Sequence, residues 1–219
     1  YGPLRLSNPY VRGYPSTLNW KQNETKIMYR GSIIGGSSAI NGAFFLRGLP
    51  EDFDDWAARG NEQWSYVKVL PFFRKLETDA DYGGDFHGRE GPMPVRRQSL
   101  DNLTQGHKSF LEACAWKGFP YCSDMNHPDA QGVGLLPIND VAGLRVNTAL
   151  GYLNPSRHRL NLTVRGEATA RRILFEEGRV VGLEVESKGE TFRLDCNEVV
   201  LCAGAIGSPF LMMHSGVGP

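Results

Sequence analysis

One stretch constrains this chain more than any other: residues 30–48, RGSIIGGSSAINGAFFLRG. It holds five glycines and three serines, no proline and no acidic residue, and its only charges are Arg30 and Arg47. A backbone with so few bulky or charged side chains can form a flexible linker or a tight turn. It can also let a large flat ligand approach the main chain. The glycine offsets match neither the G-x-G-x-x-G dinucleotide fingerprint nor a P-loop. What remains is a group of backbone N–H groups beside two hydroxyls, Ser37 and Ser38, that can face anionic or polar ligand atoms.

A second stretch combines a strand, a turn of small residues and a helix. Residues 198–203, EVVLCA, are largely apolar on both faces, which predicts a strand buried in a parallel sheet. Small residues follow it, and Ser208 and Pro209 are the cap and first-turn residues that open a helix. Such a turn lets the main chain approach a nucleotide at the helix start. Plain crossover geometry without a ligand is the alternative interpretation.

The rest of the sequence predicts a mixture of helices and strands. Residues 1–29 have no period and are expected to form an extended loop. Helical spacing and capping residues, including Ser65, occur in four segments: 50–59, 65–76, 104–117 and 148–153. From residue 160 the pattern is that of strands, with hairpin turns at 177–178 and 188–189. Some aromatic residues have helical spacing and are expected in the core rather than in a substrate pocket: Trp56, Trp64, Tyr66, Phe72 and Phe73.

Composition excludes several classes of protein. The 24 basic residues equal the 24 acidic residues, and this zero formal charge argues against capture of nucleic acid or a membrane surface. No apolar run approaches the roughly 18 residues of a membrane span, and no signal segment opens the chain. We therefore expect a cytoplasmic rather than a secreted protein. The first residue is Tyr1, so we expect the natural start to lie upstream.

The cysteines and histidines form no catalytic or metal-binding motif. The four cysteines include no C-x-x-C pair, which favours reduced, mostly buried thiols over a metal site: Cys114, Cys122, Cys196 and Cys202. His87 is in a glycine-rich turn and is expected to lie at the surface or to make a contact within that turn. His127, in a long loop, is the one histidine for which a substrate contact is weighed against a structural role. We predict no metal site and assign no histidine to catalysis.

Together the two glycine-rich stretches resemble the two signatures of the glucose–methanol–choline (GMC) flavin oxidoreductases. The first is RGSIIGGSSAINGAFFLRG, and the second is GAIGSPFLMMHSGVG at residues 204–218. Between them, FHGREGPMPV and RVNTALGYLNPSRHRLNLTV are similar to family segments in the same order. The resemblance covers the chain from about Asn19 onward.

The resemblance implies a mixed α/β and α+β fold: part of an FAD-binding βαβ domain and part of a substrate domain built on an antiparallel sheet. We expect residues 1–75 to belong to the FAD-binding domain, 76–155 to the substrate (cap) domain, and 156–219 to the FAD-binding domain again. The family's G-x-G-x-x-G is then expected before Tyr1 and its catalytic histidine after Pro219. As an isolated piece, the chain is expected to be inactive, poorly soluble and without stable flavin.

The resemblance also implies a cofactor site. The residues expected along the FAD pyrophosphate and ribityl chain are Arg30, Gly31, Gly35, Gly36 and Ser37. Those whose backbone is expected to pass the flavin ring, where main-chain dipoles favour reduced flavin, are Asn41, Gly42, Ala43 and Phe44. Those expected near the adenosine half are Ala170, where the family usually has valine, Ala203 and Gly204. Ile40 stands where covalently linked members carry histidine, which implies non-covalent FAD.

The implied activity is oxidation of a small-molecule alcohol by hydride transfer from its CH–OH group to FAD. Oxygen or another acceptor would then reoxidise the flavin. No nucleic-acid partner and no membrane span are expected. Two alternatives stay open: a hydroxynitrile lyase of the same fold, and a non-catalytic truncated remnant.

Overall fold

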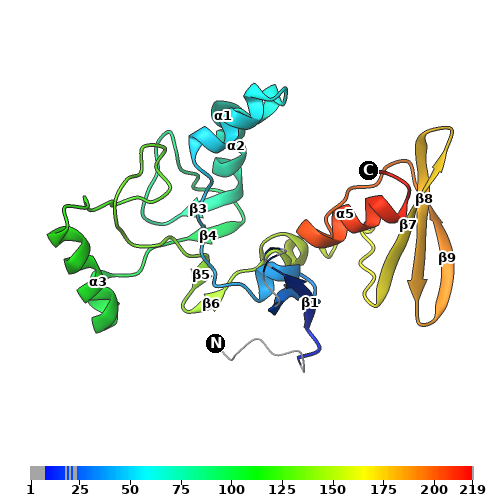
Figure 1. Cartoon of the computed structure of the whole chain (residues 1–219), viewed down its shortest axis with the longest axis horizontal. Coiled ribbons are helices and arrows are strands. Elements are labelled where there is room, and N and C mark those ends of the chain that lie inside the picture. The colour runs from blue at the N-terminus through cyan, green and yellow to red at the C-terminus, as the bar shows by residue number, and fades with distance from the viewer. Residues whose placement is uncertain (1–7, 18, 20, 22–23, 219) are drawn as a thin grey trace. The chain divides into compact units, whose positions relative to one another are not determined.

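A computed structural model describes residues 8–17, 19, 21 and 24–218. The chain divides into two compact units, Tyr1–Arg159 and Leu160–Pro219 (Figure 1). Helices and strands are mixed along the sequence, as predicted. The division of the chain into cofactor and substrate domains stays a prediction.

The first unit opens with a β-hairpin, in which β1 (Val11–Thr17) pairs antiparallel with β2 (Thr25–Gly31). The extended loop predicted for residues 1–29 is therefore wrong for these two segments. Main-chain hydrogen bonds hold the hairpin, and among its side chains only that of Val11 is fully buried. No hydrophobic period marks strands of this kind, because neither face packs on a core. The remainder of that predicted loop lies partly outside the described residues: 1–7, 18, 20 and 22–23.

Three helices lie where the sequence predicts them: α1 (Pro50–Ala58), α2 (Tyr66–Leu76) and α3 (Gln105–Trp116). The hydroxyl of Thr104 caps α3, and Gly118 in a left-handed conformation (φ 85°) follows its end. Capping residues and a C-terminal glycine lie within one turn of the helix end that they mark, so the sequence predicts these helix ends well.

The start of α2 differs in detail from the prediction. Ser65 precedes the helix, but its side chain makes no capping hydrogen bond. Instead the carboxylate of Asp54, on α1, accepts the N–H of Tyr66 at 2.9 Å. The cap therefore comes from a neighbouring helix, which spacing along the sequence does not reveal.

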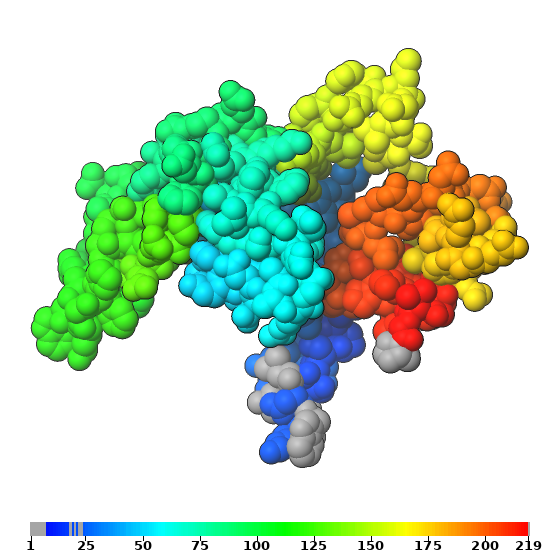
Figure 2. Space-filling view, turned by 90° about the horizontal axis from the view of Figure 1, so that it is seen from above, coloured from blue at the N-terminus to red at the C-terminus, as the bar shows by residue number. Residues whose placement is uncertain are grey.

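The aromatic residues of segment 50–76 are only partly buried, and the segment lies at the surface of the first unit in the view of Figure 2 (cyan). Tyr66 is buried, but Trp56, Trp64 and Phe72 are exposed. The predicted core role is wrong for these three, because α1 and the 3-10 helix at residues 62–64 bury no side chain and α2 buries only Tyr66 and Val69.

Short elements complete the first unit. β3 (Glu77–Asp79) pairs in parallel with β4 (Met93–Val95), and β5 (Asp140–Val141) pairs antiparallel with β6 (Leu144–Arg145). Short 3-10 helices occupy three segments: Gly36–Ala39, Glu62–Trp64 and Leu100–Asn102. The buried apolar side chains around β3 and β4 are those of Ala43, Val69, Met93, Val95 and Ile138.

A helical stretch near residue 150 continues further than predicted. A π-helix, Ala149–Leu153, leads directly into α4 (Asn154–Ser156), so Pro155 lies inside the helical stretch rather than beyond it. Proline has no backbone N–H, and in the first turn of α4 no hydrogen bond of that helix is lost by its absence.

The second unit is an antiparallel sheet with one helix. Its strands β7 (Ala168–Glu176), β8 (Arg179–Ser187) and β9 (Glu190–Asp195) pair in the order β7-β8-β9. The hairpin turns at 177–178 and 188–189 are confirmed, and all four turn residues have positive φ. Helix α5 (Gly204–His214) packs on β7 and is followed by Ser215, whose hydroxyl accepts the N–H of Ile173 at 2.8 Å.

The buried strand predicted at residues 198–203 is wrong. The segment has no strand pairing, and the side chain of Val200 is 75% exposed. A buried strand needs neighbours on both edges, and the described residues offer none to this segment. Helix α5 also starts earlier than predicted, because Ser208 lies within it and accepts the N–H of Ala203 at 3.1 Å.

The four cysteines are free thiols, as predicted, but they are not mostly buried. Cys122 is buried, Cys114 and Cys196 are half-buried, and Cys202 is exposed. The exposure of Cys202 follows from the unpaired state of residues 198–203. In the described part of the chain, no helix has the length and apolar character needed to cross a bilayer.

Candidate functional site

The first half of the glycine-rich stretch folds back on itself. A Cβ atom on Gly31 would lie 2.2 Å from the carbonyl oxygen of Gly36, so only glycine allows this approach. Gly35 and Gly36 both have positive φ, 94° and 55°. The N–H of Gly31 donates to the hydroxyl of Ser37 at 3.1 Å. Four of the five residues predicted along the pyrophosphate and ribityl chain therefore lie together, and the half-buried Arg30 precedes them in the last two residues of β2.

The second half presents its backbone at the surface of the first unit. Ala43 is in a left-handed conformation (φ 61°) and only 2% exposed, and its N–H donates to the side-chain oxygen of Asn41 at 3.0 Å. Asn41 and Gly42 are exposed, and the ring of Phe44 is 61% exposed. A non-glycine residue in this conformation costs energy and persists only where its surroundings enforce it. The four residues predicted beside the flavin ring thus form one sharply bent segment, in which Asn41, Gly42 and Phe44 are exposed and Ala43 is buried.

Residues far along the sequence hold this stretch from one side. The N–H of Asn139 donates to the carbonyl of Ala43, and the N–H of Phe45 donates to that of Pro137, both at 2.9 Å. The N–H of Thr148 donates to the hydroxyl of Ser38 at 3.1 Å. A guanidinium N–H of Arg145 donates to the carbonyl of Ala39. The sequence did not assign these supporting residues a role, although residues 145–148 belong to a segment that resembles the family.

The three residues predicted near adenosine lie in the second unit. Ala170 is exposed on β7 next to an irregularity in its pairing with β8. Ala203 and Gly204 are adjacent at the start of α5, where Gly204 has φ 81°. How these three residues relate to the loop of the first unit stays a prediction.

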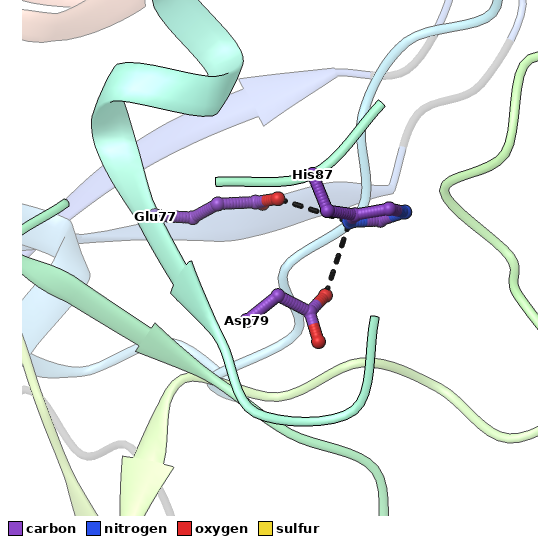
Figure 3. Close-up of side chains that lie close together, drawn as sticks. All are labelled: Glu77, Asp79 and His87. Carbon is purple, nitrogen blue, oxygen red and sulfur yellow. Dashed lines mark hydrogen bonds and ion pairs between the residues drawn. The ribbon is translucent and has the colours of Figure 1, made fainter. Parts of the chain in front are cut away.

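A cluster of buried ionisable side chains lies in the first unit, and its centre is His87 (Figure 3). The ring Nδ1 of His87 lies 3.0 Å from Glu77 Oε1 and 3.1 Å from Asp79 Oδ2. Its Nε2 lies 2.7 Å from Asp124 Oδ2. Both acids on β3 are fully buried, and His87 is 4% exposed.

Two arginines complete the cluster. Arg47 Nη2 lies 2.7 Å from Glu77 Oε1. Arg97 pairs with Asp79 and also reaches Asp124 Oδ1 at 3.0 Å. Among the buried groups, three carboxylates face two guanidinium groups and one imidazole, and these six groups are electrically neutral together when His87 is protonated. The exposed carboxylate of Asp81 also lies 3.6 Å from Arg97 Nη1.

The pKa values agree with this charge balance. Burial alone would lower the pKa of His87, but hydrogen bonds to Asp124, Asp79 and Glu77 outweigh it and raise the pKa to about 10. Burial would likewise raise the pKa of Asp79, yet hydrogen bonds from His87 and Arg97 hold it well below its usual value. The pKa of Asp124 is lowered for the same reason, against the effect of burial. His87 is thus an imidazolium ion near neutral pH.

Glu77, Asp79 and His87 also bring three possible metal-ligand atoms within 4.8 Å of one another. A metal-binding histidine must offer a free lone pair. Both ring nitrogens of His87 instead donate to carboxylates, and arginines already balance the acids. These contacts fit a structural ion network rather than a metal centre.

The surface position predicted for His87 is therefore wrong. The sequence signal that was missed is the pair of glycines after it: a Cβ on Gly88 would lie 1.8 Å from Arg74 O, and one on Gly91 2.3 Å from Glu77 N. Because these two glycines pack directly against the backbone of residues 74–77, the turn that carries His87 is buried beside β3. His127 is partly exposed and packs edge-to-face on Phe86 at 4.7 Å, and its substrate contact stays a prediction.

With this geometry established, known proteins give a direct comparison. A family model described as GMC oxidoreductase matches residues 12–219. The chain belongs to the GMC oxidoreductase family. It is 40% identical over 217 residues to an uncharacterised GMC-type oxidoreductase in the thcA 5′ region of Rhodococcus erythropolis, covering 99% of this chain and 43% of that protein. It is 43% identical over 197 residues to the oxygen-dependent choline dehydrogenase of Serratia proteamaculans, covering 87% of this chain and 35% of the relative.

A solved GMC-like structure supports the fold. Pyridoxine 4-oxidase from Mesorbium loti superposes with a TM-score of 0.90 at 32% identity, over 96% of this chain and 42% of that one. The mixed fold predicted from the sequence, a part of a larger GMC architecture, is thereby confirmed. The chain spans less than half the length of these GMC relatives.

Proposed function

We propose that the whole protein to which this chain contributes is an FAD-dependent oxidoreductase that oxidises a small-molecule alcohol. The observation that carries this proposal is the bent, glycine-rich backbone of residues 30–44, with left-handed geometry at Gly35, Gly36 and Ala43. A backbone free of bulky side chains suits close approach by a flat cofactor. Membership of the GMC family supports the same assignment.

The residues present fit the cofactor, because Gly36 leaves the main chain of the loop open: no atom lies within 4 Å of a Cβ built on it. The residues that would hold FAD are Arg30, Gly31, Gly35, Gly36, Ser37, Asn41, Gly42, Ala43 and Phe44, with Ala170, Ala203 and Gly204 for its adenosine half. When bound, FAD would accept the hydride of the alcohol CH–OH group. The chain's own task is to orient the cofactor and to supply main-chain dipoles that favour its reduced form.

The proposed attachment of FAD is non-covalent. Ile40, at the position where covalently linked members carry histidine, has no nucleophilic atom. The proton of the alcohol hydroxyl would go to a base, which the family resemblance places after Pro219. Oxygen or another acceptor would reoxidise the flavin.

The test uses the full-length protein. We expect a visible flavin spectrum, release of all the flavin into the supernatant on acid precipitation, and bleaching when an alcohol is added without oxygen. Flavin that stays with the precipitate would contradict non-covalent binding. Cyanide release from a cyanohydrin without bleaching by any alcohol would instead identify a lyase, and a colourless folded protein would identify a remnant.

A further inference from the structure

The neutral cluster around His87 is joined to the glycine-rich stretch through the side chain of Arg47. Arg47 is the last charged residue of that stretch, and its side chain is only 4% exposed. Its Nη2 donates to Glu77 Oε1 at 2.7 Å, and its Nη1 donates to the carbonyl of Phe86 at 2.8 Å. The same Glu77 oxygen accepts from Gly88 N and lies 3.0 Å from His87 Nδ1. One carboxylate oxygen therefore ties the end of the stretch to the turn that carries His87.

A second connection runs through Asp124 and Asn126. Asp124 binds His87 Nε2 with one oxygen and accepts the N–H of Asn126 with the other, at 2.7 and 3.0 Å. The buried side chain of Asn126 then forms two hydrogen bonds with the backbone of residues 45–47. Its oxygen accepts the N–H of Arg47 at 3.0 Å, and its NH₂ donates to the carbonyl of Phe45 at 2.9 Å. The amide thus replaces a neighbouring strand at residues 45–47.

His87 is the residue that both connections share. Its Nδ1 contacts Glu77, which binds the Arg47 side chain, and its Nε2 contacts Asp124, which binds the backbone of Asn126. The accessible backbone of residues 41–44 lies immediately before the segment that they fix. Its other anchors are the hydrogen bonds to residues 137–139. Without the His87 contacts, the hydrogen bonds to residues 137–139 would be the main contacts that fix this backbone.

A buried ion network adds little net stability, because apolar residues of similar volume often stabilise a protein as well or better. What such a network does provide is a fixed orientation of the segments that its side chains connect. We propose that His87 is a positioning residue for the flavin-facing backbone: through Glu77 and Asp124 it fixes Arg47 and Asn126, and through them the placement of residues 41–44. This inference rests on the proposed function, since it assumes that those residues face a flavin.

The test compares the full-length wild type with two variants and a control. His87→Gln removes the charge and one ring contact, while Asn126→Ala removes the backbone clamp and leaves the ion cluster intact. His107→Gln is the matched control, since His107 is exposed on α3. The readouts are hydrogen–deuterium exchange of residues 43–47, the FAD dissociation constant and the flavin reduction potential.

We expect the amide of Arg47, whose N–H donates to Asn126, to exchange at least about tenfold faster in both variants, with β8 of the second unit unchanged. We expect weaker FAD binding by about tenfold and a lower reduction potential, because displaced main-chain dipoles stabilise reduced flavin less. The control keeps wild-type values. If His87→Gln fails to fold, Asp124→Asn decides the outcome, because it keeps the side-chain volume but replaces the carboxylate that binds His87 Nε2 at 2.7 Å; wild-type exchange and FAD affinity in that variant would overturn the inference.

Unchanged exchange in the folded variants would overturn the inference. So would faster exchange with unchanged FAD affinity and potential, since the cluster would then serve stability alone. A wild type that binds no FAD would refute the proposed function instead, and the two failures are therefore distinguishable.

Discussion

At the scale of single residues, His87 shows how burial and charge act together. An imidazole with 4% exposure would ordinarily be neutral, yet three carboxylates keep this one protonated. The sequence predicts a surface position or a turn contact for it, because loop residues usually lie at the surface. The three carboxylate partners lie 8, 10 and 37 positions away along the sequence, and no local pattern shows them.

The raised pKa of His87 predicts a loss of stability at alkaline pH. Its pKa rises from an unfolded value of 6.5 to about 10 in the folded protein, so the folded state binds the proton more tightly. The stabilisation is complete below about pH 6.5, declines as pH rises, and is lost above about pH 10, with a slope of up to about 1.4 kcal/mol per pH unit. Urea unfolding of the full-length protein from pH 6 to 10 measures it.

His87→Gln should flatten this pH dependence, while His107→Gln should leave it as in the wild type. An equally steep decline in the His87→Gln protein would show that other groups cause it.

Gly31 provides a test of the loop geometry. Gly31→Ala places a methyl group 2.2 Å from the carbonyl oxygen of Gly36, so the loop must open. We expect a loss of about 1–3 kcal/mol in the free energy of unfolding and weaker FAD binding. The control is Gly106→Ala on α3, where the nearest atom is 4.0 Å away and alanine favours the helix. Calorimetry and FAD titration measure both effects, and wild-type behaviour of Gly31→Ala would contradict the described loop.

At the scale of elements, local signals decided what could be predicted. Helices α1, α2 and α3 and the turns of the second unit carry caps, glycines and periodic apolar residues, and they lie where expected. The hairpin β1–β2 has no buried face, and the strand expected at residues 198–203 depends on neighbours outside its own segment. The glycine-rich loop was recognisable, but its supports at residues 137–148 were not, because hydrogen bonds between distant segments leave no periodic pattern.

The turn between β3 and β4 is predicted to be intolerant of side chains at one glycine. A Cβ on Gly88 would lie 1.8 Å from the backbone oxygen of Arg74, so Gly88→Ala must push the turn away from α2 and β3. We expect a loss of at least about 2 kcal/mol in stability, measured by thermal and urea unfolding. At Gly84 (φ 76°) there is open space, and Gly84→Ala should cost only about 1–2 kcal/mol of backbone strain. The reverse order of the two variants would contradict the buried turn.

At the scale of the whole molecule, the chain resembles part of a larger GMC protein. Relatives are more than twice as long, and large apolar side chains such as Val200, Phe72 and Trp116 are at least 70% exposed. Exposed apolar surface of this extent promotes association in water.

Produced alone, the 219-residue chain is therefore expected to aggregate, to bind a hydrophobic dye and to carry no flavin. Gel filtration, dye fluorescence and visible absorbance test this. A stable monomer with a flavin spectrum would show that the chain folds and binds FAD by itself.

The most direct test of the central claim is hydrogen–deuterium exchange of the full-length protein with FAD removed and then restored. If the backbone of residues 30–44 lies along the cofactor, added FAD should slow exchange there strongly, while the hairpin tip at residues 188–189 stays unchanged. Binding of FAD with no change in the exchange of residues 30–44 would contradict the account.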